Sequence, residues 1–194
     1  MRKALFSLAL LALPLGACVS VTANDYGDHT MSHATPGDFG EATLLNASGA
    51  RVGRAVLTQG ATGLLIRIEA TGLTPGWHGV HIHSVGQCAA PFTSAGAHVN
   101  HGMPAKPHGL LNPDGPDDGD LPNIFAAADG SVSAELFTTR ARIADEGPGE
   151  WLWDADGSAI VIHANIDDHT SQPIGGAGDR VVCGVMTPWF NAQV

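Results

Sequence analysis

The stretch GVHIHSVGQC, residues 79–88, places two histidines two positions apart in an otherwise apolar run. Residues at i and i+2 of a β-strand point to the same face, so His81 and His83 are expected to project together. One buried histidine is commonly a core residue with satisfied hydrogen bonds, but two on one face, near further histidines, favour a metal site. The further histidines downstream of residue 77 are His78, His98, His101, His108, His163 and His169.

The sequence around this stretch alternates in short runs that predict an all-β fold. Of 194 residues, 25 are glycine and 12 proline, and only 14% are charged, which favours short strands and long loops over helices. About eight strands predict an antiparallel β-sandwich or flattened barrel. The strand-like runs, separated by turn residues, are EATLLN (41–46), RAVLTQ (54–59), LLIRIEATG (64–72), HGVHIH (78–83), NIFAA (123–127), SVSAELF (131–137), SAIVIHA (158–164) and RVVCGVM (180–186).

Two stretches, residues 86–123 and 164–179, interrupt this rhythm. Loops of this length in a compact domain are usually functional, or are held in place by something besides packing. The first loop contains three histidines and the acidic sequence PDDGD, residues 116–120. A bound metal would order such a loop, because metal-binding energy can act as folding energy.

The N-terminus is predicted to be a targeting segment. Arg2 and Lys3 precede a ten-residue apolar run, residues 4–13, which is too short to span a bilayer. The following LGAC, residues 15–18, resembles a bacterial lipobox in which Cys18 is lipidated. An ordinary signal peptide cut near the same place is the alternative. Either interpretation predicts export to the periplasm or cell envelope.

We therefore divide the chain into a signal peptide of the lipoprotein type (1–17), a lipid-anchored flexible tether (18–38) and a folded domain (39–194). The tether contains His29, Met31 and His33. Imidazole and thioether groups both suit copper, so this segment is either a copper-capturing motif or a solvated linker.

The charge balance restricts the partners. Without residues 1–17 the chain has 7 Lys and Arg against 19 Asp and Glu, a net charge of −12. Such a balance disfavours nucleic acid and anionic membrane surfaces, so we expect no nucleic-acid partner and membrane contact only through Cys18. It also makes the few cations conspicuous: Lys106 is the only lysine after residue 17, and Arg180 is the only basic residue after Arg142.

Cys88 and Cys183 are the two cysteines that remain once Cys18 is assigned to the anchor. In an oxidising compartment two such cysteines most simply form one disulfide, and two buried thiols are the alternative.

Five segments together resemble the copper–zinc superoxide dismutase family in its bacterial exported form. They are GVHIHSVGQC, FTSAGAHVN, HGLLNPDGPDDGDLPNI, AIVIHANIDD and GGAGDRVVCGV, and the resemblance covers roughly residues 39–187 in the family's order. It implies a Greek-key β-sandwich closed toward a barrel. It also implies an oxidoreductase with copper and zinc as cofactors, which disproportionates superoxide to dioxygen and hydrogen peroxide. Exported members occur as monomers or homodimers, so a homodimer is compatible with the resemblance.

The resemblance assigns roles to individual residues. Asp167 would link a copper histidine to a zinc histidine, and Arg180 would meet the anionic substrate. His98 would bridge the two metals and carry a proton, which makes it catalytic together with Arg180. The implied copper ligands are His81, His83, His98 and His163, and the implied zinc ligands are His98, His108 and Asp120, with Cys88–Cys183 as the family's disulfide.

The sequence departs from the family pattern at the zinc site. The family usually has a histidine three residues before the zinc aspartate, and here that position is Asp117. Zinc accepts carboxylate ligands, so we predict a site of His98, His108, Asp117 and Asp120. Two alternatives are a site without zinc, in which copper alone serves, and replacement of the missing histidine by His101.

Two other functional classes compete with a dismutase. One is a non-catalytic copper-binding or buffering protein of the cell envelope, but a storage site has no need for Arg180 or a bridging His98. The other is a structural surface domain that has lost its function, which the complete ligand set disfavours. Outside the site, His78 is interpreted as structural or exposed. Trp151 and Trp153 are expected to pack in or against the sandwich, and an exposed aromatic pair at an interface is the alternative.

Overall fold

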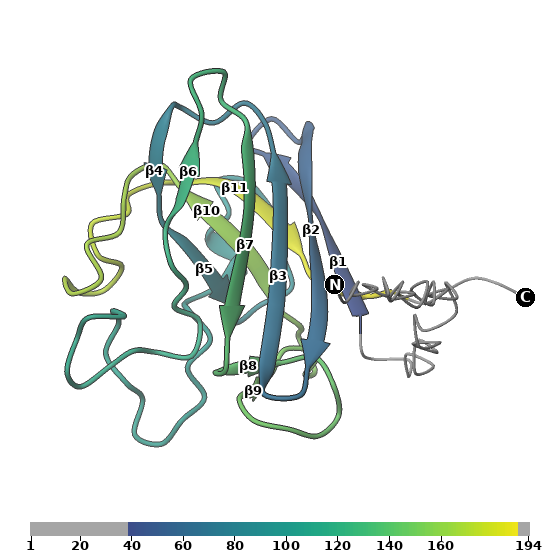
Figure 1. Cartoon of the computed structure of the whole chain (residues 1–194), viewed down its shortest axis with the longest axis vertical. Helices are drawn as coiled ribbons and strands as arrows, with labels where there is room; N and C mark the ends of the chain where they lie inside the picture. The colour runs from purple at the N-terminus through teal and green to yellow at the C-terminus, as the bar shows by residue number, and fades with distance from the viewer. Residues whose placement is uncertain (1–38, 190–194) are drawn as a thin grey trace, which may run out of the picture. The chain divides into compact units, whose positions relative to one another are not determined.

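The computed structural model describes residues 39–189, which form one large curled antiparallel sheet and two short two-stranded sheets, with long loops at one side (Figure 1). Cys18 and the His29–His33 motif lie outside the described residues. Seven strands follow one another across the sheet in the order β5-β10-β11-β1-β2-β3-β7, and β12 pairs with β1. The strands are β1 (Phe39–Asn46), β2 (Arg51–Gly60), β3 (Gly63–Ala70), β5 (Val80–His83), β7 (Val132–Thr138), β10 (Ala159–His163), β11 (Arg180–Val185) and β12 (Thr187–Pro188).

The order of the strands is that of a Greek key, in which consecutive hairpin-linked strands are followed by a long connection across the sheet. Strands β1, β2 and β3 are consecutive, after which the chain passes to β5 at the far edge and returns to β7 beside β3. Within residues 39–189 the only helix is a single 3-10 turn, η1 (Thr93–Ala95). The predicted all-β antiparallel fold is confirmed, and the sheet forms a half-barrel.

The run HGVHIH, predicted as one strand, is divided between two sheets. Its first part belongs to β4 (Gly76–His78), which pairs with β6 (Ile124–Ala126), and its second part is β5 of the main sheet. The division falls at Gly79, whose N–H donates to Asn165 O and whose carbonyl accepts from the His163 N–H. A Cβ at Gly79 would lie 2.9 Å from the Ala177 Cβ, so the close crossing of the chain depends on glycine.

A short parallel pair, β8 (Ala141–Arg142) and β9 (Glu150–Trp151), has no counterpart among the predicted strands. Trp151 on β9 is 39% exposed, whereas Trp153 packs against the main core, so the expected packing holds more fully for Trp153.

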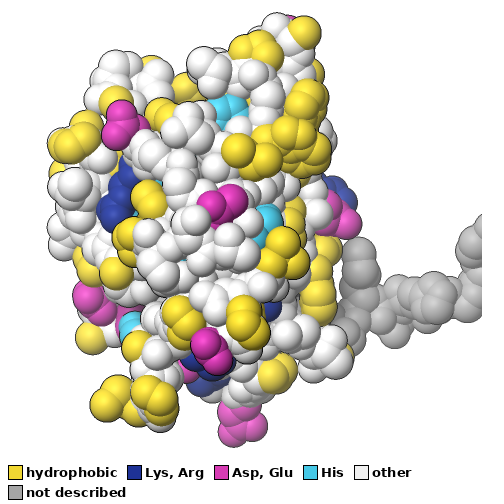
Figure 2. All heavy atoms as spheres, turned by 90° about the vertical axis from the view of Figure 1, so that its left-hand side faces the viewer, with side chains coloured by type: hydrophobic (Ala, Val, Ile, Leu, Met, Phe, Trp, Pro, Cys, Tyr) yellow, Lys and Arg dark blue, Asp and Glu magenta, His cyan; other side chains and the backbone are white. Residues whose placement is uncertain are grey.

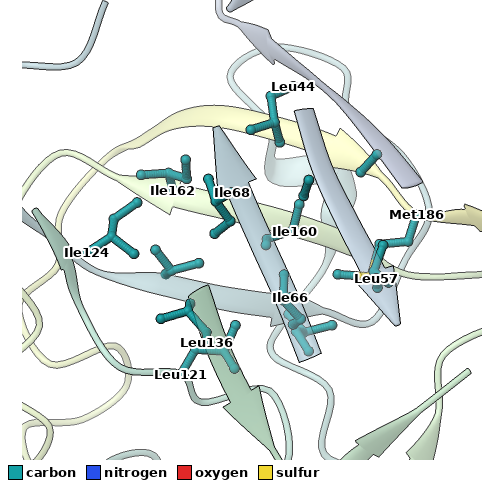
Figure 3. Packing of buried hydrophobic residues seen from close by; sticks show 14 of the residues in the cluster. Leu44, Leu57, Ile66, Ile68, Leu121, Ile124, Leu136, Ile160, Ile162 and Met186 are labelled. Carbon is teal, nitrogen blue, oxygen red and sulfur yellow. The ribbon is translucent and has the colours of Figure 1, made fainter. Parts of the chain in front are cut away.

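The core fills the inside of the curled sheet (Figure 3). The alternation on β3 shows why: Ile66, Ile68 and Ala70 are buried, and Arg67 and Glu69 between them are exposed. Each such isoleucine side chain contributes about 1.5–3 kcal/mol by leaving water. The core therefore provides a rigid wall that carries β5 and β10 at one edge.

The outer edge of β5 is covered by the loop of residues 84–123. The Ile82 N–H donates to Gly119 O (2.8 Å), the Val99 N–H donates to Ile82 O (2.9 Å), and the Ser84 N–H donates to Ala97 O (2.9 Å). This pairing satisfies an edge strand that would otherwise be open.

The disulfide between Cys88 and Cys183 ties the same loop to β11, with 5.6 Å between the two Cα atoms. This confirms the predicted disulfide. The loop is thus fixed both to the strand that carries His81 and His83 and to the strand that carries Arg180.

Candidate metal centre

Four histidines converge at the edge of the sheet. His81 and His83 come from β5, His163 ends β10, and His98 lies in the 84–123 loop. Each offers one ligand nitrogen, these four atoms all lie within 4.8 Å of one another, and every one of the four residues is buried. We call these residues the imidazole cluster.

One ring nitrogen of each of these histidines is anchored by an acceptor. His83 Nδ1 lies 3.0 Å from Gly96 O, and His163 Nδ1 lies 3.0 Å from Gly178 O. The other two rings are anchored by carboxylates, His81 Nε2 by Asp167 Oδ2 at 2.8 Å and His98 Nδ1 by Asp117 Oδ2 at 2.9 Å. Because carbonyl and carboxylate oxygens only accept, each anchored nitrogen carries the hydrogen, and the other can present a lone pair.

The remaining ring nitrogens are buried without a hydrogen-bond partner among residues 39–189. They are His81 Nδ1, His83 Nε2, His98 Nε2 and His163 Nε2. An unpartnered buried polar atom is costly, and four of them within one cluster require a common explanation. A metal ion held by imidazole nitrogens supplies it, and the donor set fits copper.

The electrostatics of three of these rings favour the neutral form that a metal needs. Burial lowers the pKa of His81 to about 3, of His83 to about 2 and of His163 to about 4. The nearby charge of Arg180 adds to the lowering at His83 and His163. These imidazoles therefore hold no competing proton at neutral pH.

A second group lies on the other side of His98. His108, Asp117 and Asp120, all from the 84–123 loop, form what we call the carboxylate cluster. Asp117 Oδ2 lies 2.9 Å from His98 Nδ1 and 4.0 Å from His108 Nδ1. Asp120 Oδ1 lies 3.4 Å from His98 Nδ1 and contacts His108 Nδ1 directly. One oxygen of each carboxylate thus faces both imidazoles.

The second oxygen of each carboxylate is fixed by the backbone. Asp120 Oδ2 accepts from the N–H groups of Gly109 (2.7 Å) and Asp117 (3.1 Å), and Asp117 Oδ1 accepts from the Gly119 N–H (3.1 Å). Backbone donors therefore hold both side chains in the orientation that a cation requires.

Around this second group, four residues have ligand atoms that all lie within 4.8 Å of one another: His81, His98, His108 and Asp120. Asp117 is not one of these four. However, His81 has its Nε2 committed to Asp167 and its Nδ1 directed at the imidazole cluster. Asp117 is consequently the residue that can complete this second group.

The carboxylates change the protonation of the imidazoles beside them. Burial acts to lower the pKa of His108, but its hydrogen bonds to Asp120 and Asp167 outweigh burial and raise that pKa to about 10. Burial likewise opposes the charge on Asp120, and the hydrogen bonds from His108 and His98 still lower the pKa of Asp120. In the metal-free chain His108 therefore holds a proton beside the ionised Asp120.

Asp167 connects the two clusters. Its Oδ2 accepts from His81 Nε2 (2.8 Å), and its Oδ1 accepts from His108 Nε2 (3.2 Å). The side-chain amide of Asn123 holds the Asp167 backbone by accepting from its N–H (2.9 Å) and donating to its carbonyl (2.8 Å). A Cβ at Gly175 would lie 1.6 Å from Asp167 Oδ1, so only glycine allows this approach.

Two side chains that sequence patterns do not reveal also support the carboxylate cluster. Gln172, from the 164–179 loop, accepts from the His108 N–H (3.0 Å) and donates to the His108 carbonyl (2.8 Å). Arg140 donates from Nε to Asp117 O (3.2 Å) and from Nη2 to Asp120 O (2.5 Å). The one available signal was the rarity of cations, which marks Arg140 without placing it.

Arg180 stands at a cleft of about 570 Å³ whose wall also includes His98, His101, Lys106 and Gln172. It donates to Phe92 O (2.6 Å) and Gly96 O (2.7 Å). No carboxylate within residues 39–189 forms an ion pair with it at 4.0 Å or less, whereas Lys106 pairs with Asp118 at 3.4 Å. Its charge is thus available to an anion entering the cleft.

The other histidines join neither cluster. The side chain of His101 is 43% exposed, and its carboxylate neighbour is Glu150 at 3.7 Å. His78 is buried, with its ring nitrogens 2.6 Å from His163 O and 2.7 Å from Thr74 O, which fits a structural role. His169 lies beside Asp167, at 3.4 Å. On the face that carries the loops, histidine side chains show only as small spots among other side chains (Figure 2).

Comparison with known proteins agrees with this geometry. The family described as copper/zinc superoxide dismutase (SODC) matches residues 51–186. The chain belongs to the copper/zinc superoxide dismutase family. It is an oxidoreductase, and the reaction of this family is the disproportionation of superoxide. The family's cofactors are copper and zinc, and two groups of buried side chains in this structure could each hold a metal ion.

Relatives and solved structures give the degree of similarity. Superoxide dismutase [Cu-Zn] of Caulobacter vibrioides is 56% identical over 131 residues, which cover 67% of this chain and 75% of the relative. Superoxide dismutase [Cu-Zn] 1 of Aquifex aeolicus is 41% identical over 132 residues, covering 67% and 76%.

Among solved structures, a SOD-like protein from Bacillus subtilis is 36% identical with a TM-score of 0.68, covering 74% of this chain and 95% of that one. Cu/Zn superoxide dismutase from Brucella abortus is 28% identical with a TM-score of 0.62, covering 76% and 98%.

Within residues 39–189 no helix has the length and apolarity needed to cross a membrane.

Proposed function

We propose that this chain disproportionates superoxide outside the cytoplasm at a copper held by His81, His83, His98 and His163. The observation that carries the proposal is the convergence of four unpartnered buried imidazole nitrogens near an arginine that has no carboxylate partner within residues 39–189. When bound, copper supplies the one-electron chemistry by which one superoxide becomes dioxygen and another, with two protons, becomes hydrogen peroxide.

The chain itself binds the anion and provides protons. Superoxide is too small to offer much binding surface, so its capture depends on steering and on a positioned charge. Arg180 supplies that charge, and the carbonyls of Phe92 and Gly96 fix its guanidinium. Of the imidazole cluster only His98 lines the cleft. His98 would carry a proton at Nε2 whenever this nitrogen is not bound to copper, and would deliver that proton at the cleft.

Zinc is proposed to bind His98, His108, Asp117 and Asp120. The support is the pair of carboxylate oxygens, one from each aspartate, that face both Nδ1 atoms while their partner oxygens are tied to backbone N–H groups. Histidine nitrogen and carboxylate oxygen are both normal zinc ligands. Asp167 would act from behind, orienting His81 and His108 toward their respective metals.

The first test concerns Arg180. Superoxide decay would be followed by stopped flow for the chain loaded with copper and zinc, beside Arg180→Gln and the matched control Arg54→Gln. Arg54 is an exposed arginine paired with Glu69 at 2.9 Å. We expect Arg180→Gln to lower the rate by about tenfold or more, with equal copper content, and Arg54→Gln to match the wild type. Equal rates for both variants would contradict the assignment.

The same measurement separates an enzyme from a copper-buffering protein. A buffering protein with the same ligands would bind copper fully while superoxide decayed no faster than in free solution. The conspicuous charge of Arg180 at the cleft favours the enzyme, because a store of copper has no use for an anion-binding arginine.

The second test concerns zinc. Metal analysis after zinc loading would compare the wild type with Asp117→Ala and His101→Ala. We expect Asp117→Ala to lose zinc and His101→Ala to retain it, since the exposed His101 joins neither cluster. Full zinc retention in Asp117→Ala would show that this carboxylate is not a ligand.

Export and lipid anchoring are also part of the proposal. Arg2, Lys3 and the apolar run of residues 4–13 support a signal peptide over 1–17, and LGAC supports lipidation of Cys18, with a tether over 18–38. Mass spectrometry of the mature N-terminus tests this: a diacylated Cys18 is expected, and an unmodified chain found in the cytoplasm would contradict it. Light scattering on the same preparation distinguishes the monomer from the homodimer.

A further inference from the structure

The carboxylate cluster concentrates negative charge in a buried turn. Asp117, Asp118 and Asp120 are 4%, 6% and 0% exposed, and they lie within four consecutive residues. Buried carboxylates so close together repel one another unless cations are near. Besides His98 and His108, the basic side chains within residues 39–189 that reach the turn are Lys106 and Arg140. Lys106 is already paired with Asp118.

Arg140 lies just after the C-terminal end of β7, outside the 84–123 loop that carries the turn. Its Nε donates to Asp117 O (3.2 Å) and its Nη2 to Asp120 O (2.5 Å). A single guanidinium thus binds the backbone of both aspartates whose carboxylates face His98 and His108. The turn's own hydrogen bond, from the Asp120 N–H to Asp117 O, is long at 3.5 Å. Arg140 thus supplies a contact that the turn itself makes only weakly.

Arg140 brings a positive charge to the turn as well as hydrogen bonds. No carboxylate within residues 39–189 forms an ion pair with it at 4.0 Å or less. Its positive charge therefore acts on the turn rather than being cancelled elsewhere. Asp117 gives this turn one more carboxylate than the usual family site, where a histidine occupies the position.

We propose that Arg140 is a positioning residue of the zinc site, which holds the Asp117–Asp120 turn and offsets the second carboxylate contributed by Asp117. The inference rests on the proposed zinc site of His98, His108, Asp117 and Asp120. Arg140 itself touches neither the metal nor superoxide, so its replacement should change the zinc affinity and not the redox step.

The chain provides a matched control in Arg142. Arg142 is also half-buried, and within residues 39–189 it also donates only to carbonyls, those of Gly149, Ala144 and Asp145, which lie outside the 84–123 loop. A general loss of an arginine that bridges carbonyls would affect both positions alike. A specific effect on zinc would appear at Arg140 alone.

Zinc affinity would be measured on the full chain by competition with a chromophoric chelator, for wild type, Arg140→Met and Arg142→Met. We expect Arg140→Met to weaken zinc binding about 10- to 100-fold, as removal of a residue supporting a ligand typically does. Arg142→Met should change it by less than about twofold, and copper affinity should stay near wild type in both. Equal zinc affinities for the two variants would overturn the proposal.

A second pair of variants tests the charge argument. In an Asp117→His background the turn has one carboxylate fewer, so Arg140→Met should cost several times less there than in the wild type. An equal loss in both backgrounds would overturn the offsetting role. If Arg140→Met does not fold, Arg140→Lys replaces it; it keeps the charge but not the two-pronged donor. It should weaken zinc less than tenfold, and a loss larger than that would count against the role of charge.

The outcomes separate this inference from the zinc site on which it rests. A wild-type chain that binds no zinc would contradict the proposed zinc site. A wild-type chain that binds one zinc, whose affinity Arg140→Met leaves unchanged, would contradict the role of Arg140 alone.

Discussion

The imidazole cluster and the carboxylate cluster meet at His98, whose Nδ1 faces Asp117 and Asp120, yet they are supported in opposite ways. His81, His83 and His163 sit on β5 and β10, strands that the core holds rigidly. The carboxylate cluster comes wholly from the 84–123 loop and depends on side chains such as Gln172 and Arg140 that reach it from elsewhere. One site is built by the sheet, and the other is assembled by tertiary contacts.

The two clusters differ also in what occupies them without metal. Three rings of the imidazole cluster are kept neutral by burial, whereas the carboxylate cluster holds protons between its carboxylates and imidazoles. A metal entering the first displaces little, and a metal entering the second must displace protons. The comparison predicts that the two sites respond differently to the same perturbations.

The largest expected difference comes from removing one ligand of a single cluster. His83→Ala should lower copper affinity and superoxide decay by at least about 100-fold, more than loss of an outer residue, and should leave zinc bound. Asp120→Ala should do the reverse, with zinc lost and copper still bound. Metal analysis of both variants, with near-ultraviolet circular dichroism as a check on folding, measures this. Loss of both metals in His83→Ala would show that the clusters are not separable.

Asp167→Asn should weaken both sites at once, because this carboxylate accepts from His81 and from His108. We expect losses of about 10- to 100-fold for each metal. Asp168→Asn is the matched control: the Asp168 carboxylate is exposed, and within residues 39–189 it accepts only from Thr170 and Ser171. An effect on one metal alone would contradict the linking role of Asp167.

A change of pH should produce a smaller difference between the metal affinities of the two clusters. The pKa of His108 is raised to about 10, so at neutral pH zinc must displace its proton, and zinc affinity should rise about tenfold per pH unit for one proton. The lowered pKa values of His81, His83 and His163, about 3, 2 and 4, leave these ligands unprotonated above about pH 5.

Copper affinity should therefore vary less steeply with pH, since among its ligands only His98 has a raised pKa. Dialysis of the loaded chain from pH 8 to pH 5, followed by metal analysis, should show zinc leaving before copper. Copper leaving first would reverse the comparison.

The smallest expected effect is at Gln172. Gln172→Glu removes the Nε2 donor to the His108 carbonyl while keeping the acceptor, and the loss of one hydrogen bond should weaken zinc about 2- to 10-fold. Gln87→Glu, at an exposed position in the 84–123 loop that also carries His108, controls for the added charge. Zinc affinity that falls equally in both variants would attribute the effect to charge alone.

Much of the imidazole cluster could be predicted from the sequence. The i, i+2 spacing of His81 and His83 is a property of any strand, and His163 closes another strand-like run, so local pattern and family resemblance indicate the same ligands. The carboxylate cluster was less accessible, because Asp117 departs from the family pattern and its orientation depends on backbone donors at Gly109 and Gly119.

Other features could not be predicted because they are tertiary. The separation of β4 from β5 depends on the crossing at Gly79, where residues from the 164–179 loop approach the backbone. Gln172 lies 64 residues from His108, and Arg140 lies 23 from Asp117. No spacing rule connects positions so far apart.

The most direct test of the account is a copper titration of the zinc-loaded chain, with superoxide decay measured by stopped flow at each addition. The account predicts a rate that rises with copper and stops rising at one equivalent, and no such rise in His83→Ala. Full copper binding with decay no faster than the uncatalysed reaction would contradict it, and the four imidazoles would then hold copper without acting on superoxide.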